Sequence, residues 1–81
     1  MKPDYSIVAH KYKGEYILGP LDIVRIKAFI LEGKSASQIG GMMIEGEQSR
    51  FEKRKIVKEM ISGCGRKYPS VFTPSLLELV R

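Results

Sequence analysis

One segment restricts the folds open to this chain of 81 residues more than any other. In residues 21–32, apolar side chains fall on nearly every side of a helix that turns by about 100° per residue. Pro20 suits the first helical position, where its missing N–H costs nothing, and Gly33 suits the residue just past the end. A helix that is apolar all round needs more than one covering neighbour. We therefore expect a mainly α domain, with this helix at its centre and Val24 and Ile30 in the core.

A second helix is predicted over residues 36–43. Ser35 followed by Gln38 matches the S-x-x-Q capping box, in which both side chains bind free amides at a helix start. Positions i, i+3, i+4 and i+7 of this helix form one inward face, which contains Ala36, Ile39, Gly40 and Met43. Because Gly40 has no side chain, we expect a neighbouring helix to approach it closely.

A third helix is predicted to start at Glu47 or Ser49, to run to Ser62, and to be ended by the glycines of residues 63–65. The preceding residues 44–49 are expected to form a loop. The inward face of this helix contains Ile56, Val57, Met60 and Ile61. The opposite face groups an aromatic residue with cations at helical spacing, namely Phe51, Arg54, Lys55 and Lys58.

Most of the net charge of +5 lies in residues 47–67, which hold seven cations against three anions. Basic helices bind phosphates by releasing counterions, while Arg54 could bind a guanine edge and Phe51 a thymine methyl or an unpaired base. The nucleic-acid-binding candidates are Arg50, Phe51, Lys53, Arg54, Lys55, Lys58, Arg66 and Lys67. In the alternative interpretation the cations are merely solvated, and Phe51 packs under residues 1–19 or the C-terminal tail.

The two ends of the chain allow more than one interpretation. Apolar and polar residues alternate on both sides of Gly14, which predicts a short N-terminal β-hairpin with its turn near Lys13. The competing interpretation is one helix that Asp4 caps and Gly14 ends. At the other end, Thr73 and the proline after it predict a short last helix. Its apolar residues either close the core or form the seam of a homodimer, and they are Leu76, Leu77, Leu79 and Val80.

Composition excludes several classes of protein. The chain has no run of about 18 apolar residues, so we expect no membrane span, and its first residues lead into no apolar region typical of a secretory signal. Cys64 is the only cysteine, and no Cys/His cluster offers a structural metal site. We expect one domain over residues 1–81, located in the cytoplasm, with no metal, no cofactor and no catalytic residues.

The segment Ser35-Ala36-Ser37-Gln38-Ile39-Gly40 is similar to the start of helix two in bacterial helix-turn-helix proteins. The resemblance covers about 25 residues and implies a helix-turn-helix-like core and a DNA-binding transcriptional regulator. The third helix, residues 47–62, would then read duplex DNA. The family usually has a glycine in its tight turn at the position of Ile44, whereas here Gly46 comes two residues later. The alternative function is a protein-binding module, an inhibitor or adaptor that presents its basic face and Phe51 to an acidic protein.

Overall fold

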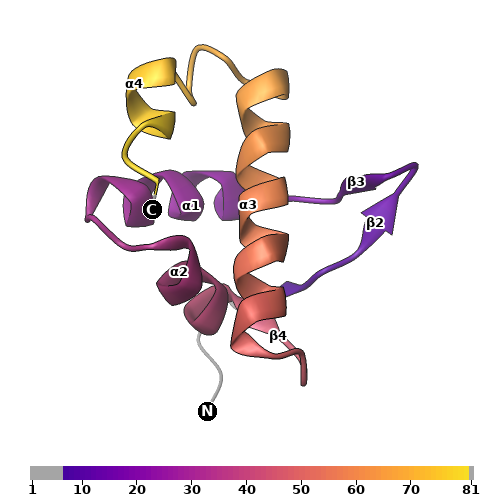
Figure 1. The fold of residues 1–81 in the computed structure, drawn as a ribbon. Helices are drawn as coiled ribbons and strands as arrows, with labels where there is room; N and C mark the ends of the chain where they lie inside the picture. The colour runs from indigo at the N-terminus through magenta and orange to yellow at the C-terminus, as the bar shows by residue number, and fades with distance from the viewer. Residues whose placement is uncertain (1–6, 81) are drawn as a thin grey trace.

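The computed structural model describes residues 7–80, which form four helices and four two-residue strands. In chain order these are β1 (Ile7–Val8), β2 (Lys11–Tyr12), β3 (Glu15–Tyr16), α1 (Pro20–Leu31), α2 (Ala36–Met43), β4 (Ile44–Glu45), α3 (Arg50–Lys67) and α4 (Pro74–Leu77). The fold is mainly helical with a short antiparallel hairpin, as the sequence predicts. In Figure 1, α3 runs along the molecule and crosses α1 steeply, with α2 and α4 on one side and the hairpin on the other.

The helix starts follow from local hydrogen bonds. The carboxylate of Asp22 accepts a hydrogen bond from the Gly19 amide at 2.9 Å, which satisfies a free donor at the start of α1. At α2 the predicted capping box is confirmed. The Ser35 amide donates to Gln38 Oε1 at 2.8 Å, and the Gln38 amide donates to Ser35 Oγ at 3.2 Å. Gly33 has φ +84°, the left-handed conformation expected just after a helix.

The predicted inward face of α2 is confirmed. All four of its residues are buried, and Gly40 meets α3 at the Lys53 backbone. A Cβ atom built on Gly40 would lie 3.0 Å from the Lys53 carbonyl carbon. This close approach explains why a glycine, which weakens a helix, lies in the middle of α2.

The core joins α1, α2 and α3, and the C-terminal segment closes one end. Its buried apolar residues are Ile26, Ile30, Ala36, Ile39, Met43, Ile44, Val57, Met60, Ile61, Cys64, Phe72 and Leu76. The prediction for Ile30 is confirmed, but the prediction for Val24 is wrong, since Val24 is 63% exposed. Helix α1 buries the face that carries Ile26 and Ile30, and Val24 lies on the opposite face. Within residues 7–80, α1 is therefore covered on one side only.

Helix α3 is longer than predicted, because it continues through Gly63 and Gly65 to Lys67. Tertiary packing explains why these glycines do not end it. The Cys64 side chain between them is buried in the core, and a Cβ atom on Gly65 would lie 3.0 Å from Leu77 Cδ1. Gly65 thus lets the side chain of Leu77 come close to α3. At its other end α3 begins after Ser49, whose Oγ accepts a hydrogen bond from the Glu52 amide at 3.1 Å.

The N-terminal region contains the predicted hairpin turn but not all of the predicted pairing. β2 pairs antiparallel with β3, and Lys13 and Gly14 both have positive φ, as type I′ turns require. One further pair extends this hairpin, since the Ile17 amide donates to the His10 carbonyl oxygen at 2.9 Å, but β1 does not join it. Instead β1 pairs in parallel with β4, inside the interval that the sequence predicts to be a loop. The alternative of one helix over residues 4–14 is wrong for the part described, from residue 7 onward, while its cap, Asp4, lies outside the described residues.

The C-terminal segment closes the core. The amide of Leu76 donates to Thr73 Oγ1 at 3.3 Å, which confirms the predicted cap of α4. Leu76 is buried, and Leu77 and Val80 pack against the core. Leu79 differs from these, because it stays 50% exposed.

Candidate nucleic-acid interface

The face of α3 that points away from the core carries an aromatic residue among cations. Phe51 is 71% exposed, and Lys55 and Lys58, four and seven residues later, are also exposed. Arg54, on the edge of this face, is half-buried. The alternative in which Phe51 packs under the N-terminal hairpin or the tail is therefore wrong. The predicted grouping of these four residues on one helical face agrees with the geometry.

The hairpin stands beside α3 (Figure 1). Residues of the hairpin and of this face of α3 line one groove. The groove has a volume of about 560 Å³. Its charged and aromatic lining residues are Lys11, Glu15, Tyr16, Phe51, Arg54, Lys55, Lys58, Glu59, Arg66, Lys67 and Tyr68. Cations thus outnumber anions in the lining, and three aromatic rings lie among them.

Two ion pairs connect the hairpin to α3 across this groove. Lys67 Nζ lies 2.9 Å from the Glu15 carboxylate, and Lys11 Nζ lies 3.2 Å from that of Glu59. The hydrogen bond and charge of Lys67 lower the pKa of Glu15, and the same contact raises the pKa of Lys67. All four side chains are about half exposed, so each pair contributes little to stability. Both pairs join the hairpin to α3.

These pairs use both carboxylates of the groove and leave an excess of cations. Among the residues that the structure describes, no ion pair engages Arg54, Lys55, Lys58 or Arg66. The ammonium of Lys11, which pairs with Glu59, also lies 5.0 Å from the centre of the Tyr16 ring. The groove and the α3 face therefore form one cationic surface with exposed aromatic edges.

The predicted site residues separate into two groups. The groove brings together Phe51, Arg54, Lys55, Lys58, Arg66 and Lys67. Arg50 starts α3 and is exposed but does not line the groove, and Lys53 is half-buried on the side that packs against Gly40 of α2. Lys67 is already engaged by Glu15.

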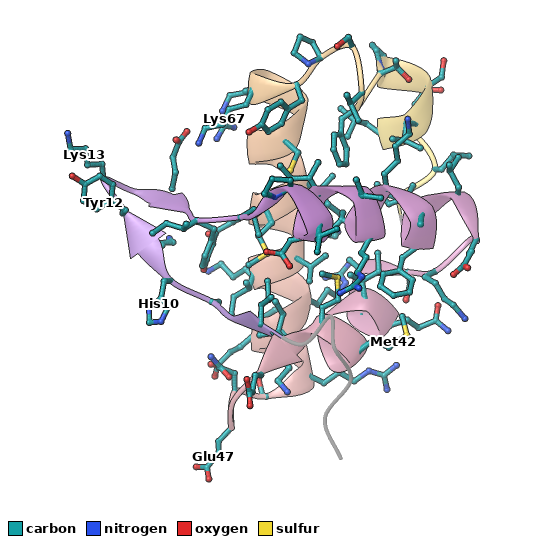
Figure 2. All side chains as sticks on the ribbon, turned by 180° about the vertical axis from the view of Figure 1, so that it is seen from behind. His10, Tyr12, Lys13, Met42, Glu47 and Lys67 are labelled. Atoms are coloured by element: carbon teal, nitrogen blue, oxygen red, sulfur yellow. The ribbon has the colours of Figure 1, made fainter. Side chains whose placement is uncertain are left out.

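Two groove residues from the hairpin, Lys11 and Tyr16, are not among the predicted ones. The signal that could have found them is the short run Lys11-Tyr12-Lys13, which puts two cations beside a turn. Figure 2 shows Tyr12 and Lys13 at the outer end of the hairpin, away from the helices, with His10 at its base.

The geometry does not favour covalent chemistry at Cys64. Burial raises the pKa of its thiol, which disfavours the reactive thiolate. Within the described part of the chain, no three His, Cys, Asp or Glu side chains come together to hold a metal ion. None of the helices in residues 7–80 has both the length and the apolar character needed to cross a membrane.

Comparisons of this chain with protein-family models, with curated proteins and with solved structures found no match.

Proposed function

We propose that this chain is a small DNA-binding protein, a transcriptional regulator that places α3 against duplex DNA. The observation that carries the proposal is the exposed face of α3, where Lys55 and Lys58 form no ion pair with a described residue and lie on the same side as Phe51. Cations on a helix bind phosphates by releasing counterions. Because these cations form no ion pair within the described part of the protein, no such contact has to break before a phosphate binds.

The shape of the surface suits a duplex. The major groove of B-DNA, about 12 Å wide, admits a single α-helix. The Phe51 face of α3 is exposed from its first turn, so base contacts from Arg54 and phosphate contacts from Lys58 can be made together. The hairpin, which carries Lys11 and Lys13, stands beside α3 and supplies a second cationic element for the adjacent backbone (Figure 1).

Two further features fit a regulator of this kind. At Gly40, α2 packs closely against α3, and a reading helix needs such support from its neighbours. A single buried cysteine suits the reducing cytoplasm, where such a regulator would act.

The second candidate function is binding of an acidic protein. It is favoured by the 71% exposure of Phe51, because a large aromatic residue amid cations is typical of an interface anchor. In this case binding would depend mainly on Phe51 and only weakly on the number of phosphates that a ligand offers.

Fluorescence anisotropy with a labelled mixed-sequence duplex tests the proposal. We expect the affinity to fall steeply as the salt concentration rises. Each phosphate contact releases counterions and contributes about 0.9 to the magnitude of the slope of log K against log salt. Lys55→Ala and Lys58→Ala should weaken binding, while Lys34→Ala, outside the groove lining, should not. Affinity that is insensitive to salt, or equal in all three variants, would contradict it.

A further inference from the structure

The side of α1 that faces away from the core is apolar along its length. Four exposed residues form this α1 stripe, namely Leu21, Val24, Ala28 and Leu31. Their exposure is high for apolar side chains, with Leu21 at 67%, Val24 at 63% and Leu31 at 61%. Figure 2 looks at the molecule from this side and shows α1 lying across the front of α3. Residues 7–80 leave the stripe open to water.

The stripe continues onto the C-terminal segment. A shallow hollow joins Leu31 to Val71 and Leu79, and Leu79 is 50% exposed. The stripe and these two residues together expose apolar surface on the order of 400 Å², a size at which a patch marks an interaction site. Scattered exposed apolar residues need no such explanation, but a continuous row on one helix does.

We propose that the α1 stripe is the contact surface of a symmetric homodimer, in which α1 packs antiparallel against α1 of a second copy. The residues of the stripe are spaced by three, four and three positions, so their spacing is the same from either end. Turning one helix end for end therefore places Leu21 opposite Leu31 of the second copy and Val24 opposite its Ala28. A two-fold interface requires this self-complementarity, because each contact occurs twice.

Side-chain size also fits two crossing helices. Helix axes are closest at the crossing point, where the small Val24 and Ala28 lie, and packed helices are about 8–10 Å apart there. The larger Leu21 and Leu31 lie at the ends, where the axes diverge and more space must be filled. A stripe with leucines in the centre would keep the axes apart.

The area is sufficient for a reversible dimer. Pairing would cover the patch on both copies, and with its polar rim the interface would bury on the order of 1,000 Å², the lower end of specific interfaces. Residues 76–80, for which a dimer seam was the alternative to closing the core, would contribute only through Leu79 at the rim, since Leu76 is buried in the core. We therefore expect association that reverses on dilution.

Sedimentation velocity on the full chain, from about 1 to about 200 µM protein, tests the dimer. We expect the wild type to shift from monomer to dimer over this range, and Val24→Glu to remain a monomer with an unchanged circular dichroism spectrum. The matched control is Ile17→Glu, because Ile17 is 62% exposed and lies off the stripe. This control should dimerise as the wild type does.

Cysteine cross-linking tests the antiparallel register. The native Cys64 is 2% exposed and should not react. A mixture of V24C and A28C chains should form the mixed disulfide, because antiparallel pairing brings these positions within the roughly 4.4–6.8 Å between Cα atoms that a disulfide needs. A parallel pair would instead link each variant to itself.

Three results would overturn the proposal: a wild type that is monomeric throughout, a dimer that survives Val24→Glu, and cross-links within each variant only. Capture of a different protein by the stripe, with no self-association, would also overturn it. None of these measurements involves DNA, so the dimer and the DNA-binding proposal can fail separately.

Discussion

A methyl group on Gly40 would lie 3.0 Å from both the carbonyl carbon and the carbonyl oxygen of Lys53, so the backbones of α2 and α3 approach closely at this point. Because the obstructing atoms belong to a helix backbone, they cannot move aside cheaply. We expect Gly40→Ala to destabilise the fold by about 1–3 kcal/mol, despite the higher helix propensity of alanine. Urea unfolding measures the change.

The neighbouring glycine provides a matched control for this experiment. A Cβ atom on Gly41 meets nothing within 4 Å, so Gly41→Ala should stabilise α2 by up to about 1 kcal/mol. Equal effects of the two substitutions would contradict the close contact of α2 and α3.

Gly63 tests the continuation of α3. A Cβ atom there would lie 3.9 Å from Arg66 Nη2, an ordinary contact, so Gly63→Ala should stabilise a continuous helix by about 0.5–1 kcal/mol. If the chain instead ended a helix here in a left-handed conformation, alanine would destabilise it. Thermal unfolding distinguishes the two signs.

Two residues of α1, Val24 and Ile30, are predicted from the sequence to lie in the core of the domain, and their substitution should change stability by different amounts. Ile30 is 1% exposed, so Ile30→Ala should cost about 2–4 kcal/mol, whereas Val24→Ala should change stability by less than about 0.5 kcal/mol. Unfolding at a few micromolar protein, where we expect the monomer, compares them. A large loss from Val24→Ala would mean that the exposed side of α1 is covered in the monomer.

The ion pair between Glu15 and Lys67 predicts a specific pH dependence. The pKa of Glu15 is lowered in the folded chain. Its contribution to the stability of the fold is therefore present above its usual pKa of 4.5 and is lost as the pH falls through the lower folded value. The pKa of Lys67 is raised in the folded chain. Its contribution to stability is therefore present below its usual pKa of 10.5 and is lost as the pH rises through the higher folded value. Between these limits the pair joins the hairpin to α3.

An NMR titration of the Glu15 carboxyl carbon checks this pair. We expect a midpoint below 4.5 in the wild type and a return toward 4.5 in Lys67→Met. Lys34→Met, which removes a cation outside the groove, should leave the midpoint where it was. A low midpoint that persists without Lys67 would show that another group causes the shift.

The proposed DNA contacts should separate by their salt dependence. Lys58→Ala should reduce the slope of log K against log salt by about one, because one phosphate contact is lost. Arg54→Ala should instead narrow the difference in affinity between duplexes of different sequence, by about 1–3 kcal/mol if Arg54 binds a guanine edge. If both variants melt at the same temperature as the wild type, their effects come from lost contacts with DNA and not from a less stable fold.

Much of the local structure was accessible from the sequence. The caps at Ser35 and Thr73 each depend on a hydrogen bond between residues three apart, and the hairpin turn depends on φ at Lys13 and Gly14. The inward face of α2 follows from helical spacing alone. For the candidate site, the same spacing places Phe51 and Lys58 on one face of α3, because residues seven apart on a helix point the same way.

The tertiary structure decided what depends on partners distant in the chain. α1 is apolar on nearly all sides, so its own sequence gives no preference for the face of Ile30 over that of Val24, and packing against the other helices makes the choice. The pairing of β1 with β4 and the continuation of α3 past Gly65, over which Leu77 packs, likewise involve residues far apart in the chain. The sequence alone set the local hydrogen bonds and the periodic faces. Packing between distant segments set which faces are buried and brought the hairpin beside the basic face of α3.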